Sequence, residues 1–152
     1  MNLSSFLIKY GIHSTSNFRL IDILNGLKIS AKVLMCDELN KIKSTKKSNI
    51  IMNLETSKDQ GSHWVAIFKS CNNNYYFDPY GLLPTKEVYN YLNQPFYYNK
   101  LQIQEPGMEC CGQLCLYILY KLNTTNDLSV DSFEEIILTM KKEIDSLLLD
   151  SN

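Results

Sequence analysis

Metal-binding and disulfide-forming residues are scarce or unevenly spaced in this sequence. It has only two histidines and one tryptophan, and Arg19 is the single arginine. Two histidines are too few to complete a convincing metal site. The five cysteines form neither an even disulfide set nor two zinc-binding pairs. The composition therefore predicts no metal and no cofactor, and it favours a reducing compartment.

Long apolar runs and a strong excess of charge are also missing. No apolar stretch approaches the length of about 18 residues that a membrane span needs, and the first residues do not have the pattern of a secretion signal. The formal net charge of -1 gives no overall attraction to nucleic acid. We expect one intracellular domain over residues 1–152, with no membrane partner.

Apolar periodicity and turn residues predict a mixture of helices and strands. Ser4 or Ser5 is the predicted cap of the first helix and Asn17 that of the second. The predicted helices cover residues 3–10, 17–27, 85–92, 111–122 and 129–148. The predicted strands cover residues 29–34, 48–54, 63–68, 75–78 and 97–103. These elements predict an α+β fold, in which a small mixed or antiparallel sheet packs against a central helix that begins at Cys111.

The segment around Cys111 has the features of a thiol nucleophile with its own oxyanion hole. Cys111 would lie in the first turn of an apolar helix, where unpaired N–H groups and the helix dipole favour a thiolate. Gly112 directly after it leaves room for a substrate carbonyl. Gln104 lies seven positions upstream, and a turn at Pro106-Gly107 would let its amide donate to the oxyanion.

The neighbouring Cys110 is a weaker candidate for the nucleophile. Leu114, Cys115, Ile118, Leu119 and Leu122 recur at helical spacing from Cys111. Cys111 is therefore on the helix stripe that faces the sheet, and Cys110 is not.

A base for this thiol must come from one of two histidines. His13 is in a polar loop with no acidic or thiol residue beside it, whereas His63 stands at the start of an apolar strand. Asp78 ends the next strand, where Pro79 and Gly81 force a turn. A carboxylate at that place can accept the imidazole N–H and orient the ring, which completes a nucleophile, base and orienting acid.

The order His, Asp, Gln, Cys and its local motifs resemble the adenovirus-type cysteine proteases, the adenain family. They resemble more distantly the deSUMOylating, Ulp-type proteases. The matching motifs are His63-Trp64, Phe77-Asp78-Pro79-Tyr80-Gly81, and Gln104-x-Pro106 leading to Cys111-Gly112, within roughly residues 50 to 122. Each motif alone is weak, but four in this order, with the same spacing from Gln to Cys, are a strong signal.

The resemblance implies a papain-like fold in the adenain and Ulp arrangement and the activity of a cysteine endopeptidase. It implies that Cys111 is the nucleophile, His63 the general base, Asp78 the orienting acid and Gln104 the oxyanion donor. It further implies a virus or virus-like mobile element as the source, with capsid or core precursor proteins cut during maturation, in the virion or where the virus assembles. An activating peptide or nucleic acid follows from family analogy only.

Two other functions remain open at this point. The deSUMOylating proteases share the His, Asp, Gln, Cys order, so an isopeptidase that removes ubiquitin or a ubiquitin-like protein is the alternative. A catalytically inactive scaffold of the same fold is the third, although such a protein has no need to keep all four residue types.

Residues 41–47 form the one locally basic stretch that we single out. They include four lysines and two hydroxyl residues, which is typical of a solvated loop. The alternative is a local site for nucleic acid or an acidic partner.

Overall fold

The structure, a computed structural model, describes residues 1–57, 63–71 and 73–150. Its helices are α1 (Leu3–Tyr10), α2 (Asn17–Gly26), the 3-10 helix η1 (Cys36–Lys41), α3 (Lys86–Leu92), α4 (Cys111–Thr124) and α5 (Val130–Asp150). Its strands are β1 (Lys32–Met35), β2 (Lys47–Asn53), β3 (Trp64–Ser70), β4 (Asn73–Phe77) and β5 (Tyr97–Tyr98). The predicted α+β fold class is confirmed.

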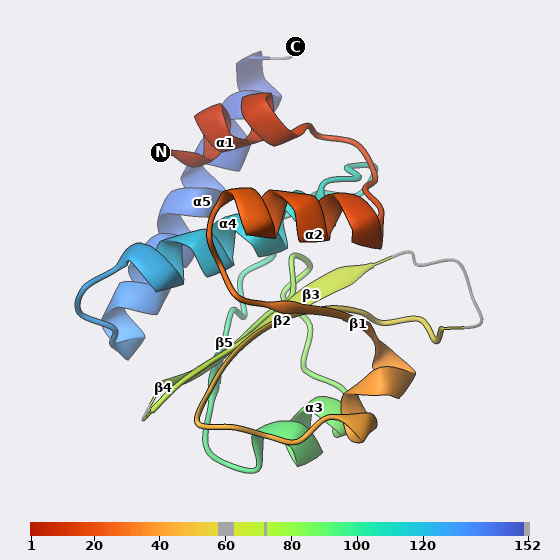
Figure 1. Ribbon diagram of the computed structural model, residues 1–152. Coiled ribbons are helices and arrows are strands. Elements are labelled where there is room, and N and C mark those ends of the chain that lie inside the picture. Colours follow the sequence, from red (N-terminus) through yellow and green to blue (C-terminus); the bar gives the residue numbers. More distant parts are fainter. Residues whose placement is uncertain (58–62, 72, 151–152) are drawn as a thin grey trace.

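The five strands form one mixed sheet in the order β1-β2-β3-β4-β5. The central pairs β2–β3 and β3–β4 are antiparallel, and the outer pairs β1–β2 and β4–β5 are parallel. Helices α1, α2, α4 and α5 lie on one face of the sheet, and α3 and η1 lie on the other (Figure 1). The sheet is therefore covered on both sides.

Strand β3 is buried on both faces. Its side chains alternate between two cores, since Trp64, Ala66 and Phe68 pack on the α4 side while Val65 and Ile67 pack on the α3 side. The strand has a partner along each edge as well. His63, the residue before Trp64, is thus attached to the most constrained strand of the sheet.

Helix α4 is the centre of the helical layer. The predicted stripe of Leu114, Cys115, Ile118, Leu119 and Leu122 is buried as expected. Leu116 and Tyr117 are buried too, because α1, α2 and α5 contact α4 while β3 packs against it. A helix that is enclosed on all sides holds its first residue, Cys111, in a fixed place.

Two predicted caps and one predicted strand were wrong. Helix α1 is capped by Asn2, whose Oδ1 accepts from Ser5 N at 2.8 Å, and α2 is capped by Ser16, whose Oγ accepts from Arg19 N at 3.2 Å. In both helices the capping side chain accepts a hydrogen bond from the backbone N–H three residues later. Each true cap therefore precedes the predicted caps, which were Ser4 or Ser5 for α1 and Asn17 for α2.

The predicted strand at 97–103 is limited to Tyr97–Tyr98. Beyond it the chain leaves the sheet, because the Asn99 side chain bonds the backbone at Asp78 and at Leu101. Such bonds from side chain to backbone compete with strand pairing.

We predict that Gly112→Ala destabilises the fold. A Cβ at Gly112 would lie 2.6 Å from Thr15 Cγ2 and 3.3 Å from both Leu20 Cδ2 and Trp64 Cδ1. Overpacking of this kind costs about 1–3 kcal/mol of unfolding free energy, which urea denaturation measures. Gly26→Ala is the matched control, because a Cβ there meets nothing within 4 Å. It should leave stability unchanged or raise it by up to about 1 kcal/mol. Equal effects of the two variants would contradict the close packing at Gly112.

Candidate active site

The sheet brings His63 and Asp78 together. Strands β3 and β4 run antiparallel, with Ala66 opposite Phe77, so the start of β3 lies beside the end of β4. His63 Nε2 is 2.8 Å from Asp78 Oδ1. The His63 side chain is 14% exposed and that of Asp78 only 1%. A buried carboxylate is an acceptor, so Nε2 carries the proton of this bond and Nδ1 is left for another partner.

That other partner is Cys111, whose thiol interacts with His63 closely enough to raise the pKa of the ring. Cys111 is the first residue of α4 and is 7% exposed. No side chain caps this helix end, and its first turn contains no acidic residue. The free N–H groups and the positive end of the helix dipole are therefore at the residue that carries the thiol, and no acidic residue of the first turn offsets them.

The electrostatics of His63 favour its charged form. Burial lowers the pKa of His63, but hydrogen bonds to Asp78 and Cys111, together with the charges of both groups, outweigh burial and raise it to about 9. At neutral pH the ring is thus an imidazolium between a carboxylate and a sulfur. This arrangement suits a preformed thiolate–imidazolium pair.

The other buried cysteines lack such an environment. Burial and the neighbouring Cys111 raise the pKa of Cys110 to about 11. Burial raises the pKa of the fully enclosed Cys115 well above its ordinary value. Both remain protonated thiols at neutral pH.

Gln104 lies near this group but is engaged elsewhere. It is 2% exposed, and its Nε2 donates to Met108 O at 2.6 Å and to Tyr80 Oη at 3.3 Å. Its Oε1 is buried and has no hydrogen-bond partner among the described residues. The structure therefore brings His63, Asp78 and Cys111 into direct contact, with Gln104 linked to them through Tyr80.

Tyr80 connects three of the predicted site residues. Its ring stacks on His63 at 4.7 Å between centroids, and its backbone N–H donates to Asp78 Oδ1 at 2.8 Å. Its hydroxyl accepts from Gln104. Our sequence analysis used Tyr80 only as part of the turn motif, because nothing in the spacing shows that the ring would reach His63.

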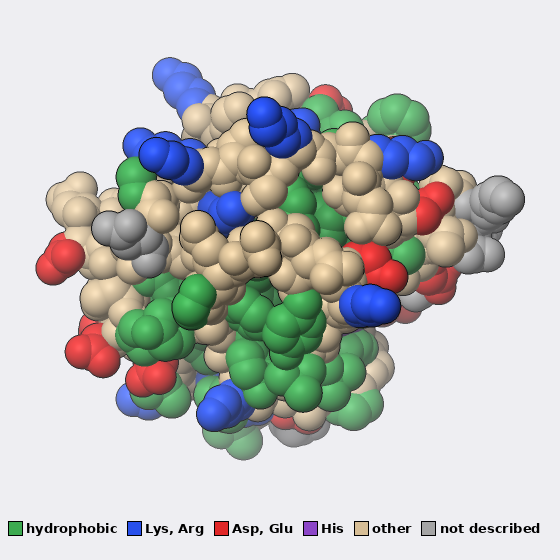
Figure 2. All heavy atoms as spheres, turned by 90° about the horizontal axis from the view of Figure 1, so that it is seen from below, with side chains coloured by type: hydrophobic (Ala, Val, Ile, Leu, Met, Phe, Trp, Pro, Cys, Tyr) green, Lys and Arg blue, Asp and Glu red, His purple; other side chains and the backbone are tan. Residues whose placement is uncertain are grey.

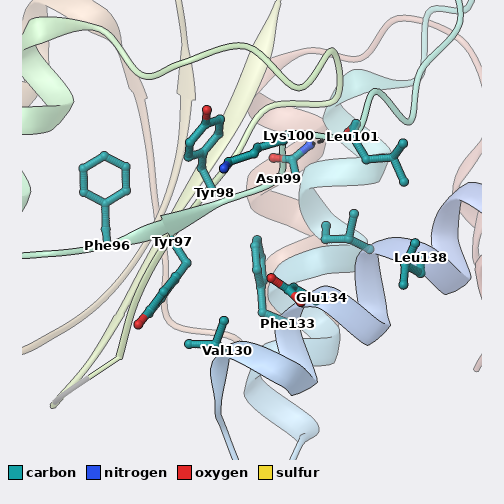
Figure 3. A pocket seen from close by; sticks show the side chains of 11 residues that line it. Phe96, Tyr97, Tyr98, Asn99, Lys100, Leu101, Val130, Phe133, Glu134 and Leu138 are labelled. Carbon is teal, nitrogen blue, oxygen red and sulfur yellow. Dashed lines mark hydrogen bonds between the residues drawn. The ribbon is translucent and has the colours of Figure 1, made fainter.

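Asn99 is a second residue that the sequence analysis missed. Its Oδ1 accepts from Asp78 N at 2.9 Å, and its Nδ2 donates to Asp78 O at 2.6 Å and Leu101 O at 3.1 Å. Asn99 is 3% exposed and forms part of the wall of a cavity of about 600 Å³ between the β5 segment and α5 (Figure 3). Its three hydrogen bonds hold the backbone at Asp78 in place.

His13, the other histidine, is solvent-exposed as expected, with 85% of its side chain accessible. An acidic residue does lie near it in space, since Glu109 Oε2 is 4.0 Å from His13 Nδ1. Gly61 and Ser62, the two residues before His63, lie outside the described residues. Over residues 1–57, 63–71 and 73–150, no cluster of three or more potential ligands suits a metal ion, and no helix has the length and apolarity to cross a membrane.

Comparison with known proteins links the chain to a viral thiol protease. No protein-family model matches it. It is 35% identical over 88 residues to "Putative thiol protease R355" of Acanthamoeba polyphaga mimivirus. The matched region covers 48% of this chain. The chain spans 29% of that relative's length. It is also similar to the crystal structure of the ASFV pS273R protease, with 19% identity, 65% of this chain and 43% of that chain covered, and a TM-score of 0.45. The chain is thus a distant homologue of the mimivirus protein.

We predict that His63 titrates near pH 9 and that Asp78→Asn lowers this value to 6.5 or below. In that variant burial is no longer offset by the carboxylate. The measurement is an NMR titration in a His13→Ala background, which leaves His63 as the single imidazole. Because the folded-state pKa is raised above the ordinary 6.5, His63 contributes stability in full below pH 6.5 and loses it as the pH rises through about 9. A His63 titration midpoint near 6.5 in the parent protein would contradict a charged imidazolium between Asp78 and Cys111.

We predict that Asn99→Ala lowers stability by about 2–4 kcal/mol, because it leaves the buried backbone N–H and C=O of Asp78 unpaired. It should also shift the His63 titration, since the position of Asp78 is no longer fixed. Asn25→Ala, at an exposed position of α2, is the control and should change stability by less than about 0.5 kcal/mol. If Asn99→Ala and Asn25→Ala have the same free energy of unfolding, the hydrogen bonds of Asn99 do not contribute to stability.

Proposed function

We propose that this chain is the catalytic unit of a cysteine endopeptidase. The observation that carries the proposal is the continuous contact from Asp78 through His63 to Cys111 at the start of a buried helix. The homology to a mimivirus protein described as a thiol protease supports it. Cys111 is the proposed nucleophile, His63 the proton carrier and Asp78 the orienting acid.

The first step uses the thiolate–imidazolium pair. A His63 pKa of about 9 means that the ring holds a proton at neutral pH. In the proposed pair Cys111 gives its proton to His63 and attacks as the thiolate. The sulfur forms a bond to the scissile carbonyl carbon, and the carbonyl π electrons move to the oxygen. The backbone N–H of Cys111, which no intrahelical bond uses, is one donor to this oxyanion.

Gln104 is the proposed second donor. One of its two amide hydrogens is held by Met108 O at 2.6 Å, which fixes the plane of the amide. The other makes the longer, weaker bond of 3.3 Å to Tyr80 Oη, and a substrate oxygen replaces this acceptor during the reaction. Binding of the oxyanion thus exchanges a poor hydrogen bond for a charge-assisted one.

The intermediate then collapses with the proton of His63. The C–N bond breaks, the leaving amine takes the ring proton, and an acyl thioester on Cys111 remains. His63, now neutral, accepts a proton from water as the water attacks the thioester. Release of the acid restores the thiolate and the imidazolium, so the protons balance over the cycle.

The proposed substrates are capsid or core precursor proteins of a virus. Two observations support this class, namely the resemblance of the four motifs to adenovirus-type proteases and the viral source of the homologue. The isopeptidase and inactive-scaffold alternatives are outcomes that the following experiment distinguishes.

We predict that Cys111 is alkylated rapidly below pH 7 and that His63→Ala slows this labelling by tenfold or more, because the thiolate loses its cationic partner. Iodoacetamide kinetics with mass spectrometry of the modified peptide measure the effect. Cys110→Ala is the matched control and should leave the rate unchanged. Labelling spread over several cysteines, with no effect of His63, would contradict the proposed pair and favour the inactive scaffold.

Cleavage assays identify the substrate class. Cys111→Ala and His63→Ala should each reduce peptide-bond cleavage roughly a thousandfold or more. Hydrolysis of unfolded precursor-like proteins without reaction at the C-terminus of a ubiquitin-like probe is the expected result. Reaction with the ubiquitin-like probe alone would replace the endopeptidase by the isopeptidase.

A further inference from the structure

A buried lysine, Lys69, lies on the far side of the sheet from the helical layer that contains α4. Lys69, near the end of β3, is 7% exposed, and its side chain lies on the α3 face. Its Nζ donates to Ser44 Oγ at 2.7 Å and lies 5.4 Å from the centre of the Tyr91 ring. No carboxylate among the described residues pairs with it. Burial lowers the pKa of Lys69, and no neighbouring anion counters this effect. Burying an unpaired ammonium costs free energy, so this group is poised to gain from an anion.

Lys69 lines a polar cavity of about 540 Å³ between residues 44–46, Cys71 after β3, and the end of α3. Ser44, Thr45, Lys46, Asn90 and Gln94 contribute hydroxyl, ammonium and amide groups to its lining. Within the described part of the chain, no aspartate or glutamate lines this cavity. The Gln94 Oε1 already accepts from Asn74 Nδ2 at 3.2 Å, which leaves the Gln94 amide N–H groups as donors.

The basic stretch of residues 41–47 supplies one of the two lysines that line the cavity, Lys46. Its other lysines, Lys41, Lys43 and Lys47, are exposed. Viewed from the α3 side, lysine and arginine side chains gather in the upper half of the molecule, while hydrophobic side chains gather in the lower half (Figure 2). Residues 44–46 of the basic stretch that the sequence analysis singled out line the same cavity as the buried Lys69.

We propose that this cavity binds a phosphate monoester group. Two ammonium groups, of Lys69 and Lys46, match the charge of a monoester, which is close to −2 at pH 7, whereas a carboxylate or a phosphodiester would neutralise only one of them. The hydroxyl and amide donors suit the three terminal oxygens of the group. The monoester is carried by a small molecule such as a nucleotide, or by the 5′ end of a nucleic acid strand.

The site is separate from the candidate active site. Lys69 is near the end of β3 and His63 directly precedes that strand, so six residues of extended chain, about 20 Å, separate them. The proposal does not rest on protease activity. Lys69→Met should leave the alkylation rate of Cys111 unchanged.

Isothermal titration calorimetry with methyl phosphate and dimethyl phosphate at constant ionic strength tests the proposal. Methyl phosphate should bind at least tenfold more tightly than the singly charged diester, and Lys69→Met should weaken it at least tenfold. Lys46→Gln should weaken it severalfold, and this variant keeps the test valid if Lys69→Met does not fold. Lys142→Gln, at an exposed position of α5, should have no effect.

Three results would overturn the proposal: equal affinity for the monoester and the diester, affinity that does not depend on Lys69 or Lys46, or no saturable binding in the millimolar range. Oligonucleotides with and without a 5′ phosphate then separate the two sources. Binding only with the 5′ phosphate identifies a strand end, and binding of methyl phosphate and nucleotides alone identifies a small molecule. Oligonucleotide binding without any terminal phosphate would instead indicate a nucleic-acid surface and contradict the monoester site.

Discussion

The buried carboxylate of Asp78 constrains the structure around the candidate site more than any other group. With 1% of its surface exposed, it needs partners that replace water, and it finds them in the His63 ring and the Tyr80 N–H. The turn that presents Asp78 is itself fixed, since Pro79 O accepts from both Ile103 N and Gln104 N. Accommodating one charge therefore organises two segments of the chain that are more than twenty residues apart.

This constraint links the three parts of the proposed mechanism. The antiparallel pairing of β3 and β4 sets His63 beside Asp78, and the burial of α4 on all sides holds Cys111 against His63. Gln104 enters through the same turn, because its backbone N–H bonds Pro79 O and its side chain bonds Tyr80. The groups of the site come from separate segments of the chain, and these contacts hold the segments together.

The sequence predicted the residues whose role follows from local pattern. Cys111, His63 and Asp78 each stand at the end of a helix or strand that periodicity and turn residues define, so their places could be inferred. Asn99 could not be, because its bonds reach a backbone 21 residues away. The same bonds ended the strand that alternation in 97–103 had predicted. Gly81 was recognised as a turn residue, but its close approach to Lys100 O, 2.9 Å from a Cβ built at Gly81, depends on the tertiary fold.

The two buried charges on this sheet differ in a way that separates their roles. The Asp78 carboxylate is paired with the His63 ring and accepts from the Tyr80 N–H, and Asn99 bonds its backbone. Its hydrogen-bonding surroundings are therefore complete without a ligand. Lys69 has one hydroxyl and the face of a ring, which leaves its charge uncompensated. Lys69 lies in β3 and Asp78 follows the neighbouring strand β4, and the two side chains have different hydrogen-bond partners. An anion at Lys69 would therefore stabilise the fold without changing the geometry at His63.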